Sequence, residues 1–179
     1  EIGSSVRPHP YSKIKLSSYI HDYLIDIEDF NAIEEFQLTE IQVNVLHIER
    51  TFIDKIMSVK RHAICGTLPG KVRHIYDVVR LYKMSEIQSF LHDEKVLKEI
   101  IEITKRTDSF YLEKRNIPEN YNPIGSYDFE SWEDRFNNEI KISYESLHKV
   151  LLYTNEMQSF DEAIKTFRDI NIIFKNIEE

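Results

Sequence analysis

Over most of the chain, apolar residues recur three or four positions apart, which is the pattern of an amphipathic helix. The clearest case follows Arg50, where the apolar positions fall on one helical face: Phe52, Ile53, Ile56, Met57 and Val59. Gly66 is expected to end this helix as a left-handed cap, and Pro69 prevents its continuation. A second helix is predicted over about 71–82, with this core face: Ile75, Val78, Val79 and Tyr82.

Similar spacing predicts further helices in the second half of the chain. Their apolar markers run through 96–103, 132–140, 142–151 and 160–174, with a proline-containing loop over 118–125. Only four glycines and five prolines occur, which favours long helices.

The first part of the chain has a different pattern. Residues 41–45 alternate apolar and polar and are rich in β-branched types, which predicts a strand. A strand end is expected over 1–5, extended chain over 7–11 because of two prolines, and a short helix over 17–27. The predicted fold class is therefore α+β and predominantly α-helical, with short N-terminal strands followed by a helical bundle.

Composition limits the class of protein. The chain has 179 residues and a net charge of −8, which argues against general coating of nucleic acid. Its single cysteine, Cys65, excludes an internal disulfide and a cysteine-based zinc site, so a reducing cytoplasm is expected. No apolar run reaches the ~20 residues of a membrane span, and no signal peptide is visible. We therefore expect no membrane partner.

Charge is unevenly distributed. Residues 49–83 hold eight Lys/Arg and three Asp/Glu, a net of +5, so the remainder of the chain carries −13. Positive charge gathered on one segment of an acidic protein suggests a local site for an anion such as phosphate.

The same segment carries a recognisable motif. It contains Glu49-Arg50-Thr51-Phe52 with Lys55, then a basic patch at Lys60-Arg61-His62, then Arg73-His74-Ile75-Tyr76-Asp77. This arrangement resembles the C-terminal portion of the AbiEii/AbiGii toxin family, which is nucleotidyltransferase-like and belongs to abortive infection and toxin–antitoxin systems. The opening Glu1–Ser5 and the closing Phe160–Ala163 also fit, so the resemblance spans most of the chain.

The resemblance implies an organisation and a reaction. Residues 1–47 would be a remnant of a nucleotidyltransferase-like α/β core, and residues 48–179 a helical region with both motifs. The intact protein would transfer a nucleotide from a nucleoside triphosphate, with Mg²⁺, to a hydroxyl of RNA or protein. A tRNA acceptor, an antitoxin encoded nearby and a role in phage defence are the corresponding expectations.

Lys55 is the first candidate catalytic residue. Nucleotidyl transfer builds negative charge on non-bridging phosphate oxygens, which a positioned ammonium stabilises. In the family that the chain resembles, the motif lysine contacts the nucleotide phosphates. The alternative is a solvated lysine on an exposed helix face that also holds Thr51, Ser58 and His62.

Asp77 is the second candidate. A carboxylate on a polar helix face can orient a lysine, bind a metal through water, or accept a proton. The alternative is an ordinary pair with Arg73, four residues earlier, of ~0.3–0.5 kcal/mol.

Four further residues are candidate nucleotide-binding groups. Arg50 and Thr51 open the first predicted helix, where free N–H groups attract anions, although helix capping explains them equally well. Arg73 and His74 open the second helix and are either phosphate contacts or surface residues. His62 is expected to be a surface residue.

The metal-binding part of the family pattern is missing. The chain has no Met at its start, and we expect it to be a fragment that lacks its N-terminal part. Glu1 is a candidate third metal acid or an ordinary strand residue. Gly3-Ser4 and Asp26-Ile27-Glu28 resemble the turn and acidic pair of nucleotidyltransferases, but more than twenty residues separate them, so we interpret both as coincidence.

Two functions of different kinds follow. In the first, the chain is part of a nucleotidyltransferase-like toxin and is inactive by itself because the metal acids are absent. In the second, it is a non-catalytic helical module that kept the scaffold and binds a partner protein.

Overall fold

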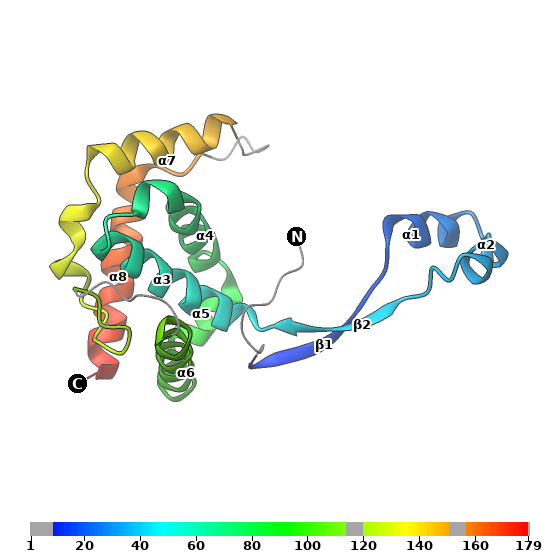
Figure 1. Cartoon of the computed structure of the whole chain (residues 1–179), viewed down its shortest axis with the longest axis horizontal. Helices are drawn as coiled ribbons and strands as arrows, with labels where there is room; N and C mark the ends of the chain where they lie inside the picture. The colour runs from blue at the N-terminus through cyan, green and yellow to red at the C-terminus, as the bar shows by residue number, and fades with distance from the viewer. Residues whose placement is uncertain (1–8, 114–119, 151–156, 179) are drawn as a thin grey trace. The chain divides into compact units, whose positions relative to one another are not determined.

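The computed structural model describes residues 9–113, 120–150 and 157–178. The chain divides into two compact units, Glu1–His47 and Ile48–Glu179 (Figure 1). Helices dominate, and the strands form one two-stranded sheet within the first unit. The expected α+β, mainly helical fold is confirmed.

The first unit is a β-ribbon with two helices between its strands. Its elements are β1 (Tyr11–Leu16), α1 (Tyr19–Asp26), α2 (Phe30–Glu35) and β2 (Ile41–Leu46). The strands are antiparallel, with Tyr11 opposite Leu46 and Leu16 opposite Ile41. The predicted strand over 41–45 and helix over 17–27 are confirmed; α2 was not predicted, and β1 continues what was expected only as extended chain. The strand end expected over 1–5 lies outside the described residues.

The strand register gives the ribbon one apolar face. Antiparallel partners project to the same side of a sheet, so five apolar side chains of the two strands lie on one face, whereas Tyr11 and its partner Leu46 lie on the other. The five are Ile14, Leu16, Ile41, Val43 and Val45. Most of them are nevertheless exposed, and Ile33 is the one buried side chain within residues 9–47. This unit therefore has almost no core of its own.

The second unit consists of helices joined by short turns. In chain order they are α3 (Ile48–Ile64), η1 (Leu68–Lys71), α4 (Val72–Tyr82), α5 (Ser85–Leu91), α6 (Glu94–Glu113), η2 (Phe129–Ser131), η3 (Glu133–Arg135), α7 (Asn138–Val150) and α8 (Phe160–Glu178). The helices predicted over 71–82, 96–103 and 160–174 are confirmed. Gly66 has a φ of 72°, as expected of a left-handed cap.

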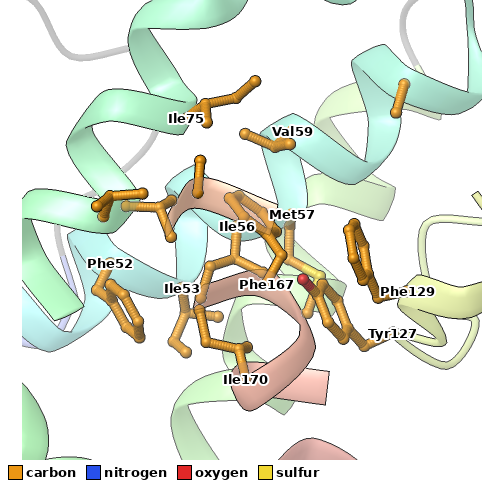
Figure 2. Packing of buried hydrophobic residues seen from close by; sticks show 14 of the residues in the cluster. Phe52, Ile53, Ile56, Met57, Val59, Ile75, Tyr127, Phe129, Phe167 and Ile170 are labelled. Atoms are coloured by element: carbon orange, nitrogen blue, oxygen red, sulfur yellow. The ribbon is translucent and has the colours of Figure 1, made fainter. Parts of the chain in front are cut away.

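The main core gathers around α3. All five apolar residues predicted for its buried face are buried, and Phe167 and Ile170 of α8 belong to the same cluster (Figure 2). Aromatic residues before α7 close the cluster: Tyr127, Phe129, Trp132 and Phe136. Phe129 and Trp132 meet edge to face, with ring centroids 4.6 Å apart. Burying these side chains fixes α3 and α4, which carry the candidate site.

One helix prediction was wrong. The segment around Trp132 forms two 3₁₀ turns, η2 and η3, before α7 begins at Asn138. The buried Trp132 indole donates a hydrogen bond to the Tyr127 carbonyl at 3.0 Å, a contact of an irregular chain path. Apolar spacing alone does not distinguish this path from a helix.

Candidate functional site

Two antiparallel helices position the candidate residues. His62, near the end of α3, stacks on His74, near the start of α4, with ring centroids 6.4 Å apart. Lys55, farther from the turn on α3, contacts Asp77, farther along α4. The order of these contacts shows that α3 and α4 run in opposite directions across the turn at 65–71.

The side chains of Lys55, His74 and Asp77 meet between the helices, and we call them the polar triad. The Lys55 Nζ lies 2.8 Å from Asp77 Oδ2 and 3.1 Å from His74 Nδ1. Exposed fractions of 29% for Lys55, 24% for His74 and 32% for Asp77 make the triad accessible from solvent but mostly covered. Asp77 pairs with Lys55 from the other helix, whereas the Arg73 side chain is exposed.

Asp77 is held as a carboxylate. Burial, the largest influence, acts to raise the pKa of Asp77, but the neighbouring His74 and Lys55 outweigh it and hold this pKa below the ordinary 3.8. The charged form is thus stabilised by the other two members of the triad.

The surroundings of the triad are electropositive. Burial first, and then the neighbouring Arg61, His74 and Lys71, lower the pKa of His62 to about 4. His62 is therefore neutral near pH 7, and its Nδ1 lies 2.7 Å from the Thr67 hydroxyl. Burial is the main reason why His62 resists protonation, and the neighbouring positive charges add to it.

The other predicted nucleotide-binding residues are arranged differently. Arg50 is 3% exposed, and its Nε donates to Asp54 Oδ1 at 2.9 Å. Thr51 is partly buried and Arg73 is exposed. Of these four residues, His74 contacts the Lys55–Asp77 pair. Glu1 lies outside the described residues.

The expected basic patch at 60–62 is not a solvent-facing patch. Lys60 is 5% exposed and donates to the carbonyls of Gly125 and Ser126. Arg61 pairs with Asp108, which also accepts from the Tyr121 hydroxyl at 3.1 Å. Both cations tie α3 to distant parts of the chain, and no sequence signal distinguished them from surface charges.

Metal ligands do not gather in the described parts of the chain. Within residues 9–113, 120–150 and 157–178 there is no group of three His, Cys, Asp or Glu side chains that could hold a metal ion. Asp26 ends α1 and Glu28 follows in a turn with a φ of 58°, so this acidic pair is not on a strand. The described residues do not by themselves fit a Mg²⁺ site.

Comparison with known protein families shows to which family the chain belongs. The family model described as nucleotidyl transferase AbiEii toxin, type IV toxin–antitoxin system, matches residues 1–166. The chain belongs to the AbiEii toxin family. The family is nucleotidyltransferase-like, and membership in a toxin–antitoxin system implies an antitoxin partner. No curated protein and no solved structure matches the chain significantly. Among the described residues, no helix has the length and apolar character to cross a membrane.

Proposed function

We propose that this AbiEii-family chain supplies the phosphate-contacting helices of a toxin that transfers a nucleotide from a nucleoside triphosphate to a hydroxyl of RNA or protein. The observation that carries the proposal is the polar triad, in which an ammonium from α3 is held between two groups of α4. A tRNA acceptor, a cytoplasmic location and a role in abortive infection belong to the same proposal.

Lys55 is the group that meets the reacting phosphate. Its ammonium is partly exposed, so a phosphate oxygen can approach it without unfolding of the helices. In the transition state of nucleotidyl transfer, charge grows on the non-bridging oxygens, and a fixed ammonium stabilises that charge. Before a nucleotide arrives, Asp77 holds the ammonium in a position where a phosphate oxygen can reach it.

Nearby cations support an anion site at the triad. Arg61 and Lys71 act on His62, which stacks on the triad histidine. Arg73 is exposed one residue before His74. These charges favour the arrival of a polyphosphate at this edge of α3 and α4 although the chain as a whole is acidic.

Mg²⁺ is assigned only to the intact enzyme, where it would neutralise triphosphate charge. The described residues do not fit a metal site, so the roles proposed for Lys55 and Asp77 do not depend on a bound ion. We also propose that this chain alone does not catalyse transfer, because its sequence has no Gly-Ser turn followed closely by an Asp-x-Asp pair. Incubation with labelled nucleoside triphosphates, Mg²⁺ and tRNA tests this; label transfer lost on substituting Asp26 or Glu28 would show a complete site in this chain.

The toxicity of the intact protein tests the role of the triad. Expressed without its antitoxin, the protein is expected to lose toxicity on Lys55→Ala or Asp77→Ala. The matched controls Lys95→Ala and Glu99→Ala change exposed residues of α6 and should remain toxic. Immunoblotting must show equal protein levels, and full toxicity of both triad variants would refute the proposed site.

A second function is favoured by one observation in the first unit. The apolar face of the β-ribbon is largely exposed, as expected of a surface that another polypeptide covers. In this alternative the chain is a non-catalytic interaction module. The complete open reading frame distinguishes the two: an upstream Gly-Ser turn followed by an Asp-x-Asp pair supports the transferase, and a frame without any such pair supports the module.

A further inference from the structure

His74 has a defined protonation state in the polar triad. A lysine ammonium has three N–H donors and no acceptor, so at 3.1 Å the Nδ1 of His74 must accept from Lys55. An accepting Nδ1 carries no proton, which makes the ring the neutral form with its proton on Nε2. His74 Nδ1 also lies 3.9 Å from Asp77 Oδ2, which is beyond hydrogen-bond distance.

In the free protein, the Lys55 ammonium forms an ion pair with the Asp77 carboxylate. An ammonium that is drawn toward a phosphate group weakens its 2.8 Å contact with the Asp77 carboxylate. Asp77 is about two-thirds covered, and a covered carboxylate that loses its partner is unfavourable. When Lys55 contacts a bound phosphate instead of Asp77, another cation is needed to pair with the Asp77 carboxylate.

His74 is placed to become that cation. Histidine is the side chain whose charge changes most readily near neutral pH. A protonated Nδ1 donates, so it would lose its interaction with Lys55 and gain one with Asp77. The approach required is about 1 Å, from 3.9 Å to the ~2.8 Å of a charged hydrogen bond.

We propose that His74 is a positioning residue that replaces Lys55 as the partner of Asp77 when a phosphate group binds, and that it takes up one proton in doing so. The proton passes from solvent to the free lone pair of Nδ1, and Nε2 keeps its own proton. Lys55 keeps all three of its protons and moves its contact from Asp77 to a phosphate oxygen. This inference rests on the proposed function and adds a proton linkage to it.

The titratable and charged groups near His74 are consistent with an exchange of partners that involves only Lys55, His74 and Asp77. From α3, Lys55 and His62 face His74, and Asp77 faces it from its own helix. Lys71 of η1 acts on His62, the neighbour of His74.

The helices α5, α7 and α8 also pack on α4, and Gln88 of α5 donates a hydrogen bond to the Tyr82 carbonyl. Tyr144 of α7 interacts with Tyr76, and Glu162 of α8 pairs with Lys83 at 2.7 Å. His62 has a pKa of about 4, so it stays neutral between pH 6 and 8.5.

Sulfate is a suitable probe because it is a tetrahedral dianion that does not titrate near neutral pH. The chain would be titrated with sulfate between pH 6 and 8.5, and the His74 ring and Lys55 Nζ signals followed by NMR. We expect sulfate to shift both signals and its affinity to fall with rising pH, by up to about tenfold per pH unit where uptake of one proton is complete.

Two substitutions separate the linkage from ordinary electrostatics. His74→Asn keeps a side-chain oxygen that can accept from Lys55 but cannot be protonated, so sulfate binding should become nearly independent of pH. His92→Asn removes an exposed histidine at the end of α5 and should keep the wild-type pH dependence.

The outcomes distinguish the inference from the function on which it rests. If sulfate binds at Lys55 of the wild-type chain with an affinity that does not change with pH, the proton linkage is overturned and the anion site remains. The same holds if His74→Asn keeps the wild-type pH dependence of sulfate binding. Absence of any sulfate-induced shift at Lys55 and His74 would overturn both. In the free protein at pH 8, ¹⁵N shifts should show a proton on Nε2 of His74, and a proton on Nδ1 would also overturn the inference.

Discussion

Replacing Asp77 by Asn tests whether the polar triad stabilises the folded chain. The substitution keeps the shape of the side chain and removes the charge that faces Lys55 at 2.8 Å. An exposed ion pair contributes ~0.2–1 kcal/mol, and loss of one partner from a fully buried pair costs ~3–5 kcal/mol. Both members here are roughly one-third exposed, so we expect Asp77→Asn to lower the free energy of unfolding at pH 7 by about 1–2 kcal/mol.

The stabilising effect of Asp77 on the folded chain should depend on pH in a defined direction. The pKa of Asp77 is lower in the folded chain than its ordinary 3.8, so its stabilising effect is fully present above that value. The effect is lost as the pH falls through 3.8 toward the folded-state pKa. Urea unfolding at pH 7, 5 and 3 should therefore show a difference between wild type and Asp77→Asn that is present at the first two values and smaller at pH 3.

A control separates this effect from a general loss of negative charge. Glu99→Gln removes an exposed carboxylate from α6 and should change the free energy of unfolding by less than ~0.5 kcal/mol. An Asp77→Asn variant as stable as wild type at pH 7, or a difference that persists unchanged at pH 3, would refute the argument.

Three further predictions concern the scaffold of the site. Lys60→Met should lower the free energy of unfolding by about 2–4 kcal/mol in urea unfolding, because two backbone carbonyls lose the buried ammonium that donates hydrogen bonds to them. Lys95→Met, at an exposed position, should not lower it. Gly66→Ala should cost about 1–2 kcal/mol by the same measurement because of its φ of 72°, whereas Gly70→Ala, which meets no atom within 4 Å, should be nearly neutral. Hydrogen exchange should be slowest in α3 and α4 and faster in β1 and β2; equal protection of the ribbon would show that it has a core which we have missed.

Strong apolar periodicity made the helices of the site predictable. The faces of α3 and α4 could be recognised because each buries a regular set of side chains, and Gly66 was recognisable because a left-handed cap favours glycine. The elements that were missed give weaker signals. β1 buries none of its six residues, and α2 has only six residues.

The site could be predicted only in part. The resemblance selected Lys55 and Asp77, but the contact of Lys55 with both His74 and Asp77 depends on how two helices are aligned across a turn. Lys60 was taken for a surface charge because its carbonyl partners lie 65 and 66 residues away in the chain. Long-range partners of this kind leave no trace in local spacing.

The most direct test of the account is nucleotide transfer by the intact protein with Lys55 replaced. Single-turnover reactions with a labelled nucleoside triphosphate, Mg²⁺ and acceptor would be compared for wild type, Lys55→Ala and Lys95→Ala, after circular dichroism has shown that all three are folded. We predict that Lys55→Ala reduces the rate by about tenfold or more, as expected for a lost transition-state contact, and that Lys95→Ala does not change it. Equal rates for all three proteins would show that the polar triad is a structural contact and not the phosphate site.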